Sequence, residues 1–204
     1  MDWMAKISDG QTGKGILFVI SSVSGGGKTT VIKSLVASQL RLRVSLSHTT
    51  RDPRKGEKDG VEYFFVSRDT FERMIRENEF LEWAEVYGQY YGTSKTAIDG
   101  AVSEGCDLIL DIDVQGALQV RERRPDAVLI FLLPPSMEEQ GKRLAKRGTE
   151  APDQLEKRLE AASGELASVF EYDYAVLNDE IGEAVVRVKS IVISERCRIG
   201  RIFP

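Results

Sequence analysis

The sequence predicts an α/β fold in which a central parallel sheet is flanked by helices. Short apolar runs rich in β-branched residues recur along the chain, and segments with the periodicity of amphipathic helices separate them. Strands that alternate with helices in this way form β-α-β units, whose strands are parallel. A length of 204 residues, of which 42% are hydrophobic and 29% charged, suits one soluble domain with a full core.

The first half of the chain follows this alternation until residue 48, where a polar and β-rich segment interrupts it. Before the interruption we expect a buried strand over 16–20, a helix over 28–40 and a strand over 42–47. The helix should direct four apolar side chains inward, namely Val31, Ile32, Leu35 and Val36. Within the interruption we expect a loop over 48–60, a strand over 62–66, a helix over 69–78 with Asp69 and Glu72 as its capping box, and a hairpin of 82–86 with 89–93.

The second half returns to regular alternation and carries a basic helical segment near its middle. The expected elements are a helix over 94–104, a strand over 107–112, a helix over 114–123, a strand over 127–133, helices that begin at Ser136 and Pro152, a strand over 174–177 and a helix over 181–198. The segment from about 48 to 95 is therefore expected as an insertion at one end of a parallel sheet.

Charge and cysteine content argue against several classes of protein. A formal net charge of -4 disfavours a protein that binds nucleic acid along its phosphate backbone. Cys106 and Cys197 are far apart and lack metal-ligand spacing, so we expect reduced thiols. The longest apolar run, 127–133, is far shorter than the ~20 residues that span a bilayer, and the tail over 1–14 lacks a signal segment. We expect a cytoplasmic protein without membrane association.

The clearest motif is a Gly-rich turn between the first strand and the first helix, ILFVISSVSGGGKTT over 16–30. This strand–turn–helix context is the one that a Walker A phosphate loop requires, and it predicts a P-loop NTPase core. Glycines let backbone N–H groups close around phosphate oxygens, and the start of the helix adds a favourable dipole. The expected ATP-binding residues are Ser24, Gly25, Gly26, Gly27, Lys28, Thr29 and Thr30, with Lys28 on the β- and γ-phosphates and Thr29 on Mg²⁺.

Two further points concern this loop and its surroundings. Ser22 occupies the first motif position, where Gly is usual, and Ser is small enough to fit. Asp111 and Asp113 end the strand over 107–112, and side chains at i and i+2 of a strand point the same way. In a P-loop protein an acid at this place orients Mg²⁺ or its waters, so Asp111 and Asp113 are candidates, and Asp111 is the expected metal ligand, partly through water. The alternative is a strand that simply ends in solvent-facing acids.

Four longer segments together resemble the guanylate kinase family. They are SLSHTTRDPRKGEKDGVEYFF (45–65), EFLEWAEVYGQYY (79–91), LDIDVQG (110–116) and RLAKRGT (143–149). The resemblance covers about residues 15–196 in the same order and is specific as a set, although Ser22-Val23 stands where many members have Gly-Pro and Thr93 where many have Ser. It implies an enzyme that transfers the γ-phosphate of ATP to GMP, with Mg²⁺ as cofactor.

The resemblance also implies roles for individual residues. Arg51 and Arg54 would hold the GMP phosphate with Tyr63 and Tyr91, while Glu82 would recognise guanine, with Ser47, Thr93 and Asp113 nearby. Arg143, Arg147 and Arg158 would reach the transferring phosphates, and Asn178 lies on the adenine side. Lys28, Arg51, Arg147 and Arg158 are the expected catalytic residues. Taken singly, these arginines could be solvated charges and the tyrosines core aromatics.

The implied architecture has three parts. The P-loop core would comprise 15–45, 97–136 and 168–204, the GMP-binding region 46–96 and the lid 137–167. The expected partners are ATP and GMP, with no nucleic acid, and either a monomer or a homodimer fits. Two other functions stay open: a scaffold module that binds phosphorylated peptides, which typically loses phosphate-loop residues that are intact here, and a kinase for another acceptor, against which Glu82 and the 45–65 segment argue.

Overall fold

The computed structural model describes residues 13–23, 25–38, 41–86, 88–146 and 162–202. Its main feature is a five-stranded sheet in which every strand pair is parallel. The strand order is β2-β7-β1-β8-β9, formed by β1 (Leu17–Ser22), β2 (Leu42–Val44), β7 (Asp107–Asp111), β8 (Val128–Leu133) and β9 (Tyr174–Leu177). The predicted α/β class with a parallel sheet is therefore confirmed.

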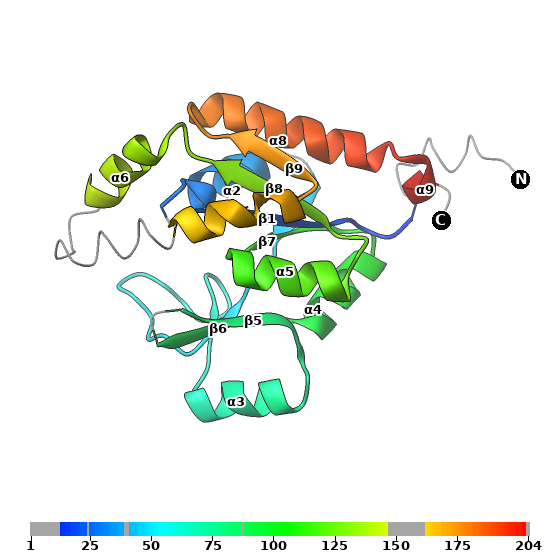
Figure 1. Cartoon of the computed structure of the whole chain (residues 1–204). Helices are drawn as coiled ribbons and strands as arrows, with labels where there is room; N and C mark the ends of the chain where they lie inside the picture. The colour runs from blue at the N-terminus through cyan, green and yellow to red at the C-terminus, as the bar shows by residue number, and fades with distance from the viewer. Residues whose placement is uncertain (1–12, 24, 39–40, 87, 147–161, 203–204) are drawn as a thin grey trace, which may run out of the picture.

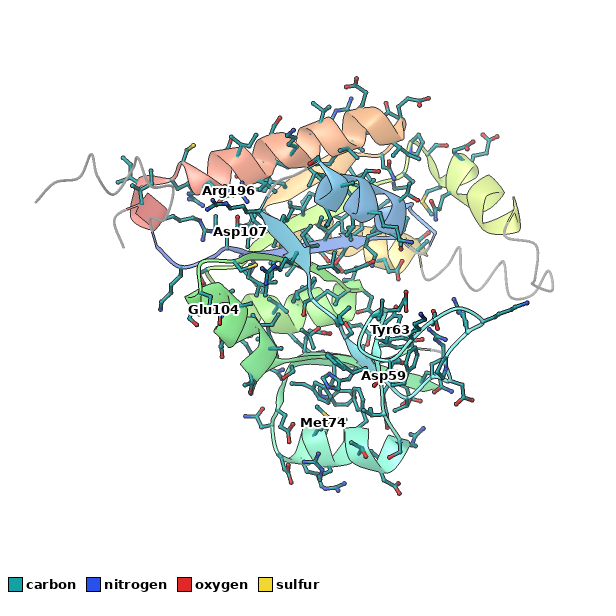
Figure 2. All side chains as sticks on the ribbon, turned by 180° about the vertical axis from the view of Figure 1, so that it is seen from behind. Asp59, Tyr63, Met74, Glu104, Asp107 and Arg196 are labelled. Atoms are coloured by element: carbon teal, nitrogen blue, oxygen red, sulfur yellow. The ribbon has the colours of Figure 1, made fainter. Side chains whose placement is uncertain are left out.

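A second sheet of four strands lies beyond one end of the first (Figure 1). Its order is β4-β3-β6-β5, formed by β3 (His48–Thr49), β4 (Phe64–Phe65), β5 (Phe80–Val86) and β6 (Gln89–Ser94). The predicted hairpin is present, with Gly88 at a φ of 77° between its strands. Asp59 and Tyr63 pair through an isolated bridge just before β4, and Figure 2 shows both in the loop region of this sheet.

Helices cover both faces of the parallel sheet, as Figure 1 shows. α2 (Lys28–Ala37) and α8 (Ile181–Arg196) pack on one face, and α4 (Lys95–Ser103) and α5 (Val114–Arg123) on the other. Other helical elements are α3 (Arg68–Arg76) against the second sheet, α6 (Met137–Lys146), the 3₁₀ turn η1 (Ser168–Glu171), which follows helical residues 162–167, and α9 (Ile199–Ile202). Among the described helices, none combines the length and apolarity that crossing a membrane requires.

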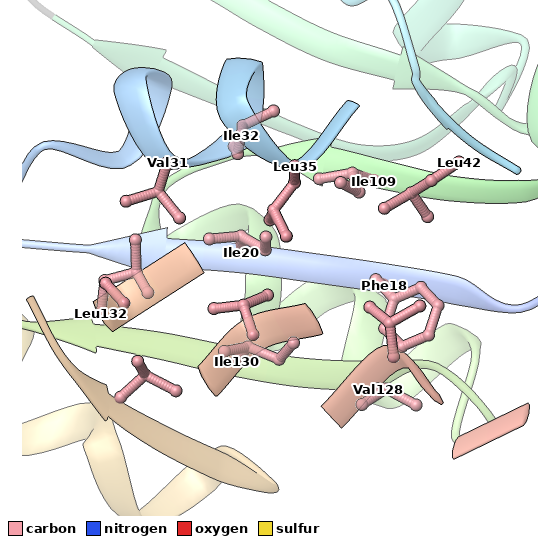
Figure 3. Close-up of a cluster of buried hydrophobic side chains, with 14 of the residues drawn as sticks. Phe18, Ile20, Val31, Ile32, Leu35, Leu42, Ile109, Val128, Ile130 and Leu132 are labelled. Carbon is pink, nitrogen blue, oxygen red and sulfur yellow. The ribbon is translucent and has the colours of Figure 1, made fainter. Parts of the chain in front are cut away.

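The hydrophobic core consists of two main layers separated by the parallel sheet. Along β1, Phe18 and Ile20 point to the α2/α8 side, and Leu17 and Val19 to the α4/α5 side. Figure 3 shows the first layer, where Val31, Ile32 and Leu35 of α2 meet the strand side chains. Because both faces of the sheet are covered, its three central strands, β1, β7 and β8, are buried along most of their length, which explains why they appear as apolar runs in the sequence.

Several predicted details of the elements were wrong. Val36 is 37% exposed, so only three of the four side chains expected to face inward from α2 are buried, namely Val31, Ile32 and Leu35. The strand after α2 spans only three residues, 42–44, and β3 lies inside the segment predicted as a loop. The C-terminal helix ends at Arg196, and α9 follows as a separate turn.

The predicted capping box of α3 was also wrong. Its N-cap is Ser67, whose backbone is extended and whose hydroxyl accepts a hydrogen bond from the Thr70 backbone N–H at 3.2 Å. Asp69 already lies in the first turn, where a carboxylate interacts favourably with the helix dipole instead of capping it. By contrast, the predicted cap of α6 has the expected contact, because Ser136 Oγ accepts from the Glu139 N–H at 3.0 Å.

Candidate active site

The Gly-rich loop joins the carboxyl end of β1 to the start of α2. Gly25 and Gly27 have φ angles of 80° and 83°, in the left-handed region that disfavours other residues. Gly26 has no room for a side chain, since a Cβ there would lie 2.8 Å from the Ser22 side chain. Ser22 itself ends β1 with its hydroxyl bonded to the Val23 carbonyl at 3.0 Å, so this position requires no glycine.

Lys28 is the first residue of α2, and its ammonium group reaches across to the end of β7. It donates to the Ile112 carbonyl at 2.7 Å and lies 3.1 Å from the Asp111 carboxylate. Thr29 and Thr30 are exposed at the start of the same helix. The loop therefore brings one cation, backbone N–H groups and two hydroxyls to the carboxyl edge of the sheet, where ligands of open α/β sheets bind. Ser24 lies outside the described residues.

Asn178 closes the loop from the opposite side. It directly follows β9, and its Nδ2 donates to the Gly26 carbonyl at 2.6 Å. A Cβ on Gly27 would lie 2.7 Å from the same nitrogen, so the glycine permits this close approach. Asn178 thus stabilises the shape of the Gly-rich loop, and the family resemblance implies that Asn178 lies on the adenine side of the site.

The predicted metal ligands fit a Mg²⁺ ion that is bound mostly by phosphate and water. Among the described residues, no three His, Cys, Asp or Glu side chains gather as a metal site. Mg²⁺ needs no such cage, because it keeps several waters and takes one or two protein oxygens beside substrate phosphates. The exposed Thr29 hydroxyl and the Asp111 carboxylate, which is 30% exposed, are oxygen ligands of that kind.

The second sheet presents a buried carboxylate, Glu82 on β5. The residue is only 3% exposed, and Thr93, buried on the paired strand β6, donates its hydroxyl to Glu82 Oε1. Burial raises the pKa of Glu82 to about 7, and the nearby charge of Asp113 adds to the shift, whereas the hydrogen bond from Thr93 opposes it. An acid that loses its proton near neutrality inside a protein is typical of a functional site.

The segment 111–116, which runs from the last residue of β7 into the first turn of α5, links this acid to the phosphate loop. Asp111 and Ile112 contact Lys28, and the next residue, Asp113, caps α5 by accepting from the Gly116 N–H at 2.9 Å. Gly116 lies directly against Glu82, because a Cβ there would be 2.4 Å from Glu82 Oε2. The segment therefore contacts Lys28 at its start and Glu82 at its end.

Arg51 closely follows β3 of the second sheet, and its guanidinium group lies beside two aromatic rings. Arg51 donates from Nη2 to both oxygens of Glu57, at 3.0 and 2.9 Å, and its guanidinium carbon is 5.5 Å from the centre of the Tyr63 ring. The Tyr63 and Tyr91 rings meet edge to face at 6.1 Å. Burial raises the pKa of Tyr63, and the charge of Asp111 adds to the shift, so this cluster faces the end of β7.

Comparison with known proteins identifies the family. The guanylate kinase family model matches residues 14–195. A guanylate kinase from Caldanaerobacter subterraneus subsp. tengcongensis is 50% identical over 188 residues, covering 92% of this chain and 91% of the relative, and one from Desulfitobacterium hafniense is 49% identical over 187 residues, covering 92% and 94%. The chain belongs to the guanylate kinase family. A crystal structure of guanylate kinase from Anaplasma phagocytophilum matches with a TM-score of 0.77 at 34% identity, covering 93% of this chain and 90% of that one.

Membership of the guanylate kinase family confirms the resemblance that the four sequence segments predicted. Guanylate kinases are nucleoside monophosphate kinases, ATP:GMP phosphotransferases, so this chain is an enzyme of that class. Relatives of about 50% identity that span nearly the whole chain carry the enzyme's name, which argues against the scaffold alternative.

Some of the expected guanylate kinase residues are brought together, and others are not described. Lys28, Asp111 and Asp113 gather at the carboxyl edge of the parallel sheet, and Glu82 with Thr93 lies beside them. Ser47 is half-buried and pairs through its carbonyl with the Phe64 N–H, and Arg54 is exposed. Arg147 and Arg158, together with the side chain of Arg143, lie outside the described part of the chain.

Three residues of this guanylate kinase site were missed by the sequence reasoning. Glu57 bonds to the guanidinium of Arg51 and to the Arg54 backbone N–H at 2.7 Å, and so shapes the segment that holds both arginines. Gly116 makes room for the Glu82 carboxylate, and Gln119 binds the backbone next to it. Glu57 and Gly116 stand within the quoted family segments, whereas the role of Gln119 depends on a contact 36 residues away in the chain.

Proposed function

We propose that this chain transfers the γ-phosphate of ATP to GMP, giving ADP and GDP, in the space between the Gly-rich loop and the second sheet. The observation that carries the proposal is the 111–116 connection, which contacts Lys28 at one end and the buried acid Glu82 at the other. A phosphate-binding loop and a base-reading carboxylate are thereby held at a fixed spacing, as an acceptor nucleotide requires.

In this proposal Glu82 selects guanine. Guanine presents its N1–H and its 2-amino group side by side, and one ionised carboxylate accepts from both. Adenine presents an acceptor at N1, so two lone pairs would face each other. A buried site that leaves polar groups unpaired rejects the wrong substrate by large factors. Thr93 orients the carboxylate, and Ser47 and Asp113 are assigned to the remaining contacts with the base.

The GMP phosphate is assigned to Arg51 and Arg54 with the hydroxyls of Tyr63 and Tyr91. One nitrogen of the Arg51 guanidinium, Nη2, already donates to both oxygens of the Glu57 carboxylate, an anion whose place a phosphate would take. A guanidinium suits a phosphate because its planar fork can donate to two oxygens at once. Its position over the Tyr63 ring limits its freedom before the nucleotide arrives.

The ATP phosphates are assigned to the Gly-rich loop. Backbone N–H groups of 24–30 would surround the β-phosphate, and Lys28 would leave its contacts with Asp111 and Ile112 to reach the β- and γ-phosphates. Thr29 and Asp111 would hold Mg²⁺, which neutralises the phosphate charge during transfer when it is bound. The segment 46–96 would then be the GMP-binding region and 137–167 the lid, with Arg143, Arg147 and Arg158 completing the charge around the phosphate.

The test is an assay of ADP formation with ATP, Mg²⁺ and each of GMP, AMP, CMP and UMP, run on wild type, Lys28→Ala and Glu82→Gln. We expect turnover with GMP alone, its loss in Lys28→Ala, and a raised KM for GMP in Glu82→Gln with the KM for ATP unchanged. Comparable turnover with another acceptor, or none from the folded wild-type chain, would contradict the proposal.

A further inference from the structure

Side chains of α5 form hydrogen bonds with β5, an edge strand of the second sheet. β5 is the edge strand in the order β4-β3-β6-β5, and α5 lies alongside it (Figure 1). An edge strand leaves alternate backbone groups without partners in the sheet. Gln119 of α5 supplies partners to one residue of this edge: its Nε2 donates to the Trp83 carbonyl at 2.7 Å, and its Oε1 accepts from the Trp83 N–H at 3.3 Å.

A second side chain, one helical turn farther along α5, holds the other side of Glu82. Arg123 Nη1 donates to the carbonyl of Leu81, and it lies 3.4 Å from the carbonyl of Phe80. Glu82 therefore stands between two residues, Leu81 and Trp83, whose backbone groups are both bonded to the same helix.

The pairing of β5 with β6 explains why this support is needed. Phe80 pairs with Ser94 and Glu82 with Thr93, so the register shifts at Leu81, as in a β-bulge. A bulge leaves one residue out of the ladder and redirects the neighbouring side chains. Arg123 bonds to the carbonyl of this extra residue, and the side chain that follows is the Glu82 carboxylate.

We propose that Gln119 and Arg123 are positioning residues for base recognition, which hold the bulged strand so that the Glu82 carboxylate stays against Thr93 and Gly116. The proposal rests on the function proposed above, in which Glu82 reads guanine. An amide is suited to this task because it offers one donor and one acceptor to the same residue, as a neighbouring strand would. Both side chains bond to the backbone of β5 on either side of Glu82, so they act through the position of its carboxylate.

The first test compares Gln119→Leu with Glu122→Leu. The first change removes both bonds to Trp83, whereas Glu122 is an exposed polar residue three positions farther along the same helix and serves as the control. We expect the KM for GMP to rise about tenfold in Gln119→Leu, because two hydrogen bonds are lost and the carboxylate is less well placed. The KM for ATP and the constants of Glu122→Leu should stay at wild-type values.

A double mutant separates positioning from a general structural effect. If Gln119 acts through Glu82, Gln119→Leu should raise the KM for GMP much less in a Glu82→Gln background than in wild type. If each substitution raises the KM for GMP in the double mutant by the same factor as it does alone, the proposal is overturned. A Gln119→Leu enzyme with an unchanged KM for GMP would overturn it as well. Gln119→Glu keeps the acceptor for the Trp83 N–H and loses the donor to the Trp83 carbonyl. Its KM for GMP should therefore lie between those of wild type and Gln119→Leu.

Hydrogen exchange at the Trp83 amide tests the contact without any substrate. Exchange should be faster in Gln119→Leu than in wild type and unchanged in Glu122→Leu, and equal rates in all three would contradict the role of the Gln119 amide. A folded wild-type chain that does not phosphorylate GMP would overturn the function proposed above, whereas an active wild type with a fully active Gln119→Leu overturns the positioning role alone.

Discussion

Glu82 is an acid that the fold buries almost completely, at 3% exposure, and this has a cost that depends on pH. Its native pKa of about 7 lies above the value of 4.5 expected in the unfolded chain. Between these values the native state binds more protons than the unfolded state, so the free energy of unfolding falls as pH rises. The contribution of Glu82 is therefore fully present below pH 4.5 and lost as pH rises through about 7.

Glu82→Gln should remove this dependence, because an amide stays neutral at every pH. We expect the variant to be more stable than wild type at pH 8, by roughly 3 kcal/mol for a carboxyl pKa raised from 4.5 to about 7, and nearly equal to it at pH 4.5. Urea unfolding at both pH values gives the comparison. Glu85→Gln, at an exposed acid on the same strand, is the control, and a Glu82→Gln variant that is no more stable at pH 8 would contradict the burial argument.

The same proton should control GMP binding. Only the ionised carboxylate accepts from both guanine donors, so the KM for GMP should rise as pH falls from 8 to 6, by up to about tenfold per unit below the pKa. The KM for ATP should not follow. The GMP phosphate also gains a proton in this range, and Glu82→Gln shows how much of the change comes from the substrate, since its own side chain does not titrate. Identical pH profiles in both proteins would exclude Glu82 as the source.

At the scale of elements, α5 connects the two sheets, and Gly116 is where its backbone comes closest to the acid. Replacing Gly by Ala inside a helix usually stabilises it by about 1 kcal/mol. In Gly116→Ala, however, the new Cβ would be 2.4 Å from Glu82 Oε2 and 3.2 Å from the Ile112 side chain. We expect this variant to bind GMP more weakly and to gain no stability, as measured by the KM for GMP and by urea unfolding.

Gly100→Ala provides the matched comparison for that helix argument. Gly100 is an exposed residue within α4, and a Cβ there would meet nothing within 4 Å. The Gly100→Ala variant should have a free energy of unfolding about 0.5–1 kcal/mol higher than wild type, with unchanged kinetic constants. If Gly116→Ala and Gly100→Ala have the same KM for GMP and the same free energy of unfolding, the close approach of Gly116 to Glu82 contributes to neither quantity.

The elements also show which features the sequence could predict. Strands buried on both faces appear as apolar runs, so the three central strands of the parallel sheet, β1, β7 and β8, were expected close to their observed positions. The edge strand β2 is shorter than expected, and only its first residue is buried. The Gly-rich loop was predictable because its residues are consecutive. The bonds of Gln119 and Arg123 to β5 were not, because they depend on which edge of the second sheet meets α5. The cap at Ser67 was missed because Asp69 and Glu72 offered the same pattern two residues later.

At the scale of the whole molecule, the parallel sheet separates the proposed active site from a group of ionic contacts at its opposite edge. Asp107, at the start of β7, accepts from the Ile16 N–H and from Arg196 Nε, both at 2.7 Å, and Arg196 also donates to the Arg41 carbonyl at 3.3 Å. Figure 2 shows Asp107 and Arg196 side by side. This contact fastens the end of α8 to the start of the sheet, whereas Lys28 and Glu82 lie toward the carboxyl ends of its strands.

Asp107→Ala should therefore lower stability without changing catalysis. The Asp107 side chain is 9% exposed and that of Arg196 31%, so we expect a loss of about 2–3 kcal/mol, below the full value for a completely buried pair because solvent screens the arginine. The KM for ATP and for GMP should stay at wild-type values at temperatures where the variant is folded. Asp99→Ala, which breaks an ion pair with Arg124 at a 68% exposed carboxylate, should cost less than about 1 kcal/mol. The Asp107 contact only fastens the end of a helix, so a rigid sheet would pass no change from it to the proposed active site. A raised KM in Asp107→Ala would therefore mean that the two edges of the sheet are coupled.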